Sequence, residues 1–448
     1  MPRLVGELFQ AGAPVSRLVL RGARWPGDVA MDGGRITAVG SVPEEAGDEV
    51  VRVDGDIVTA GLINTHHHFY QWMTRGWAFD CTLFGWLTTL YPVWARLTPE
   101  DVEAASAVAM GELALTGCTT AADHHYLVPG GDDSVFDAIA AAARTIGIRA
   151  HIARGSMDLG QSKGGLPPDS VVEDLDAILA STQSVYERLH DGDRVVVTVA
   201  PCSPFSVTPE LMTESAALAR RHGLRLHTHL AETLDEERSC LERFGRRPLQ
   251  VLDDIGWIAS DVWVAHGIHF DDAEVRRLAE TGTGIAHCPS SNCRLGSGIA
   301  RVVDLTRAGA PVGLGVDGVA SNEIGGLFPE MRMALFLARQ RDLSSTTFLP
   351  SDSLRLATEG GARCLGRDDI GRLEPGYRAD VVVWPGDDLA DVLDPLAGLV
   401  LGPERHARHV FVEGAYVVRD GTLLGADIHT LRRELARRAR RLWPQGAT

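Results

Sequence analysis

Short apolar runs rich in valine, isoleucine and alanine recur along the chain, and polar stretches separate them. Eight of these runs predict buried strands: 57–63, 117–122, 149–153, 195–200, 225–228, 262–265, 284–286 and 312–316. Helix signals lie between them. Thr98-Pro99-Glu100 predicts one helix start and Gly117 its end, while Thr208-Pro209-Glu210 predicts another start. Strands that alternate with helices predict an α/β fold, a parallel (β/α)8 barrel of the TIM type.

Both ends of the chain show the pattern of short antiparallel strands. Segments 18–22 and 29–39 contain hairpin signals, with Asp32-Gly33 as the expected turn. Segments 379–384 and 409–418 repeat this pattern near the other end. The chain of 448 residues is longer than one barrel needs. We therefore predict a small β-sandwich built from residues 1–60 and 367–448, and a barrel built from residues 61–366.

Composition narrows the class of protein. A hydrophobic fraction of 45% with 23% charged residues is typical of a globular domain. No apolar stretch approaches the roughly 18 residues of a membrane span, and the start of the chain lacks the pattern of an export signal. The seven cysteines show no paired metal spacing, which suits a cytoplasmic protein. The net charge of −17 argues against a nucleic-acid partner, although segment 431–443 is basic and predicts an amphipathic helix packed on the barrel.

Several predicted strands end in residues that can carry out chemistry. These residues are His66-His67-His68, Asp123, Arg154, Cys202, His229, His266, His287 and Asp317. In a parallel barrel the carboxyl ends of the strands meet at one face, where the active site lies. Alternate side chains on a strand share a face, so we expect His66 and His68 to point the same way and His67 the other way.

His66, His68, His229 and Asp317 are the expected metal ligands, with an open position for water. A metal in such a site lowers the pKa of water towards neutrality. Barrel hydrolases with two metals often use a carboxylated lysine on the fourth strand, whereas the single lysine of this chain, Lys163, lies in a predicted loop. We therefore expect one divalent metal per chain, with Zn²⁺ first and Fe²⁺ as the alternative.

Three residues are the expected catalytic groups. Asp317 can take a proton from the attacking water, and Glu232, three residues after His229, can protonate the neighbouring ring nitrogen of a substrate. His266 can orient the water or stabilise the oxyanion. His227 shares the face of His229 one layer deeper, so we expect it, like His287, to support the site without binding metal.

Gln71, Arg154 and Cys202 are the candidate substrate-binding residues. The amide of Gln71 can both donate and accept, which suits a lactam edge, although it could instead order its own loop. Arg154 could bind a substrate carbonyl, or it could form an ion pair with Asp123. Cys202 could touch the substrate, but no base is paired with it as a nucleophile would require.

The combination H-x-H, H-x-x-E, His and Asp resembles the amidohydrolase superfamily in its aminohydrolase branch. Segments 64–71, 90–94, 200–207 and 287–292, and the segment 371–380 near the end, carry this resemblance. Within that family they are similar to bacterial 8-oxoguanine deaminases, whose relatives include triazine hydrolases and pterin deaminases. The resemblance implies zinc ligands at His66, His68, His229 and Asp317, catalysis by Glu232 and His266, and a substrate contact at Gln71. Segment 321–328 and the tryptophans 72 and 77 depart from the deaminase pattern, and we expect both to line the pocket mouth.

The leading hypothesis is a metal-dependent deaminase of an amino-substituted heterocycle, with 8-oxoguanine converted to urate and ammonia. The runner-up is a triazine-type or pterin aminohydrolase. A cyclic amidase is disfavoured because the strand-four lysine is missing, and a non-catalytic binding protein because the ligand set and Glu232 are intact. The expected partner is a small heterocyclic substrate, with neither nucleic acid nor membrane, and the sequence is compatible with a homo-oligomer.

Overall fold

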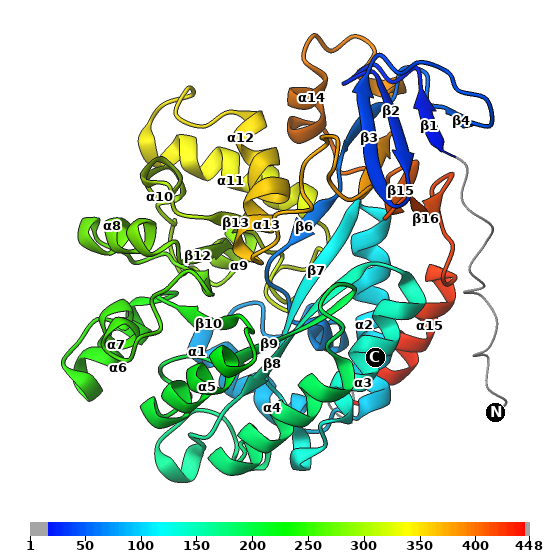
Figure 1. Cartoon of the computed structure of the whole chain (residues 1–448). Coiled ribbons are helices and arrows are strands. Elements are labelled where there is room, and N and C mark those ends of the chain that lie inside the picture. Colours follow the sequence, from blue (N-terminus) through cyan, green and yellow to red (C-terminus); the bar gives the residue numbers. More distant parts are fainter. Residues whose placement is uncertain (1–16, 444–448) are drawn as a thin grey trace, which may run out of the picture.

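The computed structural model describes residues 17–443, and a closed barrel of eight parallel strands lies at its centre (Figure 1). The strands follow one another around the barrel in chain order: β6 (Leu62–Asn64), β7 (Cys118–His125), β8 (Arg149–Ser156), β9 (Val195–Pro201), β10 (Leu226–Leu230), β11 (Val262–His266), β12 (Gly284–His287) and β13 (Val312–Leu314). Pairing of Leu314 with Asn64 joins β13 to β6 and closes the ring. The predicted barrel is confirmed.

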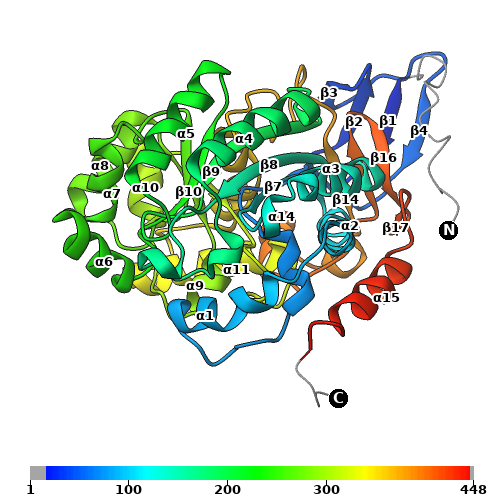
Figure 2. The same cartoon turned by 90° about the horizontal axis from the view of Figure 1, so that it is seen from below.

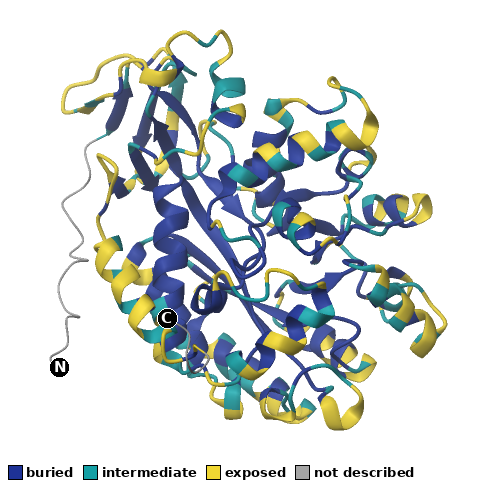
Figure 3. Cartoon of the chain, turned by 180° about the vertical axis from the view of Figure 1, so that it is seen from behind, coloured by how far each residue is buried: buried dark blue, intermediate teal, exposed yellow. Residues whose placement is uncertain are grey.

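Helices surround this barrel, as the view from below shows (Figure 2). They are α2 (Pro99–Leu115), α3 (Ser134–Ile146), α4 (Leu175–Leu189), α5 (Pro209–Arg221), α6 (Leu234–Phe244), α7 (Pro248–Asp254), α8 (Asp272–Thr281), α9 (Pro289–Arg294), α10 (Val302–Ala308), α11 (Leu327–Asp342), α12 (Pro350–Arg355) and α13 (Gly361–Cys364). The strands are buried, whereas the helices expose one face (Figure 3). The predicted helix starts are confirmed, and the Thr208 hydroxyl caps α5 by accepting the N–H of Leu211.

The apolar run 57–63 contains two strands instead of the one predicted. β5 (Ile57–Ala60) belongs to a second sheet, and β6 begins the barrel. The chain changes sheets at Gly61, whose N–H bonds to Asp380, while the next N–H, of Leu62, bonds to Gly117. A Cβ at Gly61 would lie 2.2 Å from the Thr119 hydroxyl, so only glycine fits this crossing. Both strands are buried on both faces, and the apolar pattern therefore carried no sign of the break.

Two sheets from opposite ends of the chain form the predicted sandwich (Figure 1). One has the order β3-β2-β1-β4, from β1 (Leu18–Arg21), β2 (Asp28–Asp32), β3 (Arg35–Gly40) and β4 (Glu49–Arg52). The other has the order β17-β16-β15-β14-β5, with β14 (Val381–Trp384), β15 (His409–Val412), β16 (Ala415–Arg419) and β17 (Thr422–Leu423). Leu20, Val29, Val58, Val381 and Phe411 belong to the core between them. The first hairpin turns at Gly33-Gly34, one residue later than predicted. We propose residues 60/61 and 366/367 as the domain boundaries.

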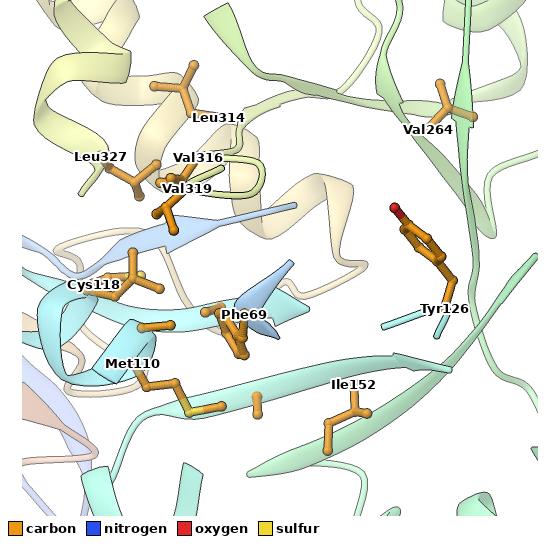
Figure 4. Packing of buried hydrophobic residues seen from close by; sticks show 14 of the residues in the cluster. Phe69, Met110, Cys118, Tyr126, Ile152, Val264, Leu314, Val316, Val319 and Leu327 are labelled. Atoms are coloured by element: carbon orange, nitrogen blue, oxygen red, sulfur yellow. The ribbon is translucent and has the colours of Figure 1, made fainter. Parts of the chain in front are cut away.

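A single large hydrophobic cluster joins the barrel to its helices. Figure 4 shows part of it, including Met110 of α2, Cys118 of β7 and Leu327 of α11. Two further segments cover the mouth of the barrel: η1 (Phe69–Thr74), which is wholly buried, and α1 (Leu83–Trp94). Both contribute residues to the cavity described below.

The basic segment near the end forms α15 (Ile428–Ala439), which lies along α2 (Figures 1 and 2). Arg438 and Arg441 of this segment pair with Asp101 of α2, whose side chain is fully buried. The predicted amphipathic helix on the barrel is therefore confirmed. No helix within residues 17–443 is long and apolar enough to cross a membrane.

Candidate metal and catalytic site

The four predicted metal ligands meet at the carboxyl end of the barrel. His66 and His68 follow β6, His229 lies in β10, and Asp317 follows β13. Asp317 Oδ1 is 3.4 Å from His66 Nε2 and 3.3 Å from His68 Nε2. His68 Nε2 is 3.1 Å from His229 Nε2. All four residues are buried, and the structure brings together the set expected from the sequence.

Hydrogen bonds on the far side of each ring fix where the protons lie. His68 Nδ1 donates to the His124 carbonyl at 2.6 Å, and His229 Nδ1 donates to the Cys202 carbonyl at 2.7 Å. His227 Nδ1 donates to the Trp263 carbonyl at 2.9 Å, so its Nε2 accepts the Nδ1–H of His66 at 2.8 Å. Nε2 of His66, His68 and His229 is consequently a bare lone pair in each ring.

Three lone pairs and a carboxylate oxygen facing one another need a cation between them. A tetrahedral zinc site with bonds of about 2.0–2.1 Å separates its ligand atoms by about 3.3 Å. The observed separations of 3.1 to 3.4 Å agree with that value. His66 Nε2 is also buried without a hydrogen-bond partner. The residues present therefore fit a divalent metal.

His124 is a neighbour of this site that the sequence did not single out. Its ring stacks on His229 with 4.7 Å between centroids, and its Nε2 donates to the Ala200 carbonyl. His124 directly follows Asp123, the predicted end of the second strand. Extending that strand by one residue would have placed this histidine at the carboxyl face of the barrel. His124 also belongs, with His66, His68 and His229, to a buried group whose possible ligand atoms all lie within 4.8 Å of one another, and its Nδ1 has no hydrogen-bond partner.

Asp317 is held by a second set of contacts. Its Oδ2 accepts hydrogen bonds from Ser291 Oγ at 2.6 Å and from Ser321 Oγ at 3.1 Å. Its backbone is left-handed, with φ of +61°, a strained conformation of the kind found at functional sites. The two hydroxyl groups orient the carboxylate so that Oδ1 faces the histidines. Ser291 lies in segment 287–292, which was quoted for the family resemblance without a role.

Glu232 and His266 form a buried pair beside the ligands. Glu232 Oε2 is 3.5 Å from His266 Nε2, and His266 Nδ1 bonds to Asn292 Oδ1 at 3.0 Å. Burial raises the pKa of Glu232 to about 7. Burial alone would lower the pKa of His266, but the charges of Glu232 and Asp317 raise it above its usual value. The pair can thus hold and exchange a proton near neutral pH.

These groups open onto a narrow cavity of about 30 Å³. Its polar lining is His68, Gln71, Tyr91, Tyr126, Cys202, His229, Glu232, His266 and Asp317, and its apolar lining is Leu83, Trp86, Leu87, Phe205 and Leu295. Gln71 Oε1 is buried without a hydrogen-bond partner. Burial raises the pKa of the Cys202 thiol to about 12, so this cysteine stays protonated and is unsuited to nucleophilic attack.

Arg154 does not line this cavity, which corrects the prediction that it binds substrate. Its guanidinium pairs with Glu173 at 2.8 Å and with Ser181 at 2.9 Å, and it packs over the ring of Phe136 in α3. Because α3 covers the outside of the barrel, Arg154 points outwards. The alternative partner, Asp123, is not paired with Arg154 either: its Oδ1 accepts the backbone N–H of Phe69, and its Oδ2 has no hydrogen-bond partner. Strand β8 is buried on both faces, so its sequence did not reveal which side chains point inwards.

The mouth of the cavity also differs from the prediction. Neither Trp72, Trp77 nor any residue of segment 321–328 is among its lining residues. Trp72 lies against Gly325, where an added Cβ would meet its ring at 2.5 Å. Trp72 and segment 321–328, which both depart from the family pattern, thus pack against each other. The apolar wall of the cavity comes from α1, with Leu83, Trp86 and Leu87.

A closed parallel barrel with a histidine-rich metal site at its strand ends defines a class of barrel hydrolases. The model of the amidohydrolase family matches residues 57–417 of this chain. The chain is 49% identical to the 8-oxoguanine deaminase of Pseudomonas aeruginosa, over 93% of this chain and 95% of that protein. It is 40% identical to hydroxydechloroatrazine ethylaminohydrolase of Pseudomonas sp., over 76% of this chain and 72% of that protein.

Solved structures agree with the sequence relatives. An atrazine chlorohydrolase from Arthrobacter aurescens, complexed with zinc, superposes with a TM-score of 0.89 at 31% identity, covering 94% of this chain and 100% of that one. The chain belongs to the amidohydrolase family. It is an enzyme, a hydrolase of carbon–nitrogen bonds other than peptide bonds, and within that family a hydrolytic deaminase.

Proposed function

We propose that this enzyme removes the exocyclic amine of 8-oxoguanine and releases urate and ammonia. The observation that carries the proposal is the buried Glu232–His266 pair, which lines the same cavity as His68, His229 and Asp317. This arrangement supplies proton transfer at one small, partly apolar pocket, as deamination of a flat heterocycle requires. The 49% identity to an 8-oxoguanine deaminase supports this substrate over others.

We further propose one divalent metal per chain, Zn²⁺ before Fe²⁺, bound by His66, His68, His229 and Asp317. When bound, the metal acts as a Lewis acid and makes water a nucleophile near neutral pH. Lys163, the single lysine of the chain, belongs to η3 (Gln161–Lys163) and bonds to the Asp158 carbonyl. It cannot bridge a second metal in the barrel, which supports the count of one.

Three residues transfer protons or stabilise the charge that develops during the reaction. Asp317 receives a proton as water attacks the carbon that bears the amine. Glu232 holds a proton near neutral pH and delivers it to the adjacent ring nitrogen. His266, oriented through Asn292, directs Nε2 towards Glu232 and stabilises the developing charge. A carbon–oxygen bond forms, and Asp317 passes the proton it received to the amine. The carbon–nitrogen bond then breaks, ammonia leaves, and the new hydroxyl returns a proton to Glu232 as it becomes the product carbonyl.

Gln71 and Cys202 are the proposed substrate contacts. Gln71 lines the cavity and has an unpartnered amide oxygen, which can accept an N–H of a lactam edge. Cys202 offers a neutral thiol to the same space. The second candidate function, a triazine-type or pterin aminohydrolase, is favoured by the 40% identity to a triazine-degrading aminohydrolase and by the apolar wall of α1.

The test is direct. The zinc-loaded enzyme is given 8-oxoguanine, and urate and ammonia are measured together. We expect both products in a ratio of one to one. Ammonia release from a triazine or pterin without release from 8-oxoguanine would transfer the assignment to the second candidate.

A further inference from the structure

Glu236 is a fully buried carboxylate that lies outside the cavity and takes no part in the chemistry proposed above. It is in the first turn of α6, where the Thr233 hydroxyl caps the helix by accepting the Glu236 N–H at 3.2 Å. Its two oxygens point back along the chain. Oε1 accepts the N–H of Ala231 at 3.0 Å, and Oε2 accepts the N–H of Glu232 at 2.8 Å.

The bonded amides belong to a tight elbow between β10 and α6. Ala231 has a left-handed backbone with φ of +53°, which is strained for a residue with a side chain. The Ala231 carbonyl accepts the N–H groups of Ile268 and His269, at 2.9 and 3.1 Å. The elbow that carries Glu232 is therefore joined to the loop that follows His266 at the end of β11.

Ordinary helix capping does not account for these contacts. In a capping box the third helical residue bonds back to the N–H of the capping residue, here Thr233. Glu236 instead binds the N–H groups of Ala231 and Glu232, the two residues before Thr233, which lie outside the helix. A buried charge is costly unless it is fully hydrogen-bonded, so an apolar residue would serve packing better at this position. The two carboxyl oxygens accept one N–H each, which a glutamine amide with its single acceptor oxygen cannot do.

We propose that Glu236 is a positioning residue, which holds the Ala231–Glu232 elbow so that the Glu232 carboxylate stays within reach of His266 and the substrate. This inference rests on the catalytic role proposed for Glu232. Glu236 acts through the backbone of Glu232 and touches neither substrate nor metal ligand. The 3.5 Å contact between Glu232 and His266 is the geometry that it preserves.

Glu236→Gln tests the proposal, because a glutamine can accept only one of the two N–H groups and turns an NH₂ towards the other. Residues that orient reacting groups typically contribute about 10- to 100-fold. We expect kcat on 8-oxoguanine to fall by about that factor, with KM within about twofold and zinc content unchanged. Glu237→Gln is the matched control: it makes the same change one residue on, where the side chain is paired with Arg247 outside the cavity, and should leave kcat unchanged.

Two further measurements separate this proposal from the function on which it rests. In the Glu232→Gln background, Glu236→Gln should cause no further fall in kcat, because Glu236 acts through Glu232. Amide hydrogen exchange in peptides covering 230–233 and 267–269 should quicken in Glu236→Gln and not in Glu237→Gln, whatever the substrate. Unchanged exchange in the elbow overturns the proposal, as does an undiminished kcat. If Glu236→Gln fails to fold, Glu236→Asp, with both oxygens on a shorter stem, should show the same changes in smaller measure.

Discussion

At the scale of single residues, the site depends on where each histidine keeps its proton. Backbone carbonyls accept hydrogen bonds from the Nδ1–H groups of His68 and His229, and His227 Nε2 accepts one from the Nδ1–H of His66. Every one of these acceptors is fixed by the barrel strands, so the lone pairs are aimed before any metal arrives. Sequence spacing could identify the ligands, but it could not identify these supports. The carbonyl of Cys202, for example, leaves no mark in the sequence.

Glu232 and Asp317 line the same cavity but have different proposed roles, and one substitution distinguishes these roles. Glu232→Gln keeps the size of the side chain and removes the proton that it delivers. We expect kcat to fall by at least about 100-fold, the low end of general acid–base contributions. The zinc content, measured by elemental analysis, should stay at the wild-type value. Loss of zinc together with activity would show that Glu232 is a ligand and that its assigned role is wrong.

The same residue makes a prediction for stability. Burial raises the pKa of Glu232 from 4.5 to about 7, so between these values the folded protein holds a proton that the unfolded chain releases. The stability associated with this group is fully present below pH 4.5 and is lost as the pH rises through 7. In metal-free protein, the Tm of Glu232→Gln relative to wild type should therefore be higher at pH 8 than at pH 5. An equal difference at both values would contradict the raised pKa.

At the scale of elements, the sequence predicted most strands and helices because their patterns are local. The capped starts of α2 and α5 and the eight apolar runs all correspond to observed elements. The predictions were wrong where the structure depends on tertiary contacts. The break at Gly61 and the outward direction of Arg154 lie in strands that are apolar on both faces, so periodicity carried no information there. Segments 321–328 and η1 pack together, which no local rule could foretell.

The docking of α15 on α2 gives a prediction at this scale. Asp101 is fully buried and accepts hydrogen bonds from Arg438 and Arg441, whereas Glu434 pairs near the surface with Arg437 and with Arg438. Asp101→Asn should lower Tm by about 2–4 °C and expose α15 to proteolysis, because it weakens a buried pair. Glu434→Gln should change Tm by less than about 1 °C, as exposed pairs contribute little. Equal effects of both substitutions would contradict this account.

At the scale of the whole molecule, the sandwich and the barrel are built from different parts of the chain, and the candidate site lies in the barrel. Chain ends far apart in sequence build the sandwich, while the proposed metal ligands lie at the carboxyl ends of β6, β10 and β13. Because the single lysine, Lys163, lies in η3 and not on a barrel strand, we predict one metal per chain. Elemental analysis of purified protein should find close to one zinc or iron per chain. Two tightly held metals per chain would overturn the inference from the missing lysine.

Polar groups in the cavity are proposed to select an oxo-purine as the substrate. A site that hydrogen-bonds its substrate rejects analogues without those groups strongly, whereas apolar walls discriminate weakly. The decisive measurement is kcat/KM of the zinc-loaded enzyme for 8-oxoguanine and for an ethylamino-substituted triazine, from the amine released. We predict a preference for 8-oxoguanine of about 100-fold or more, reduced in Gln71→Ala. Equal or better turnover of the triazine would contradict the account.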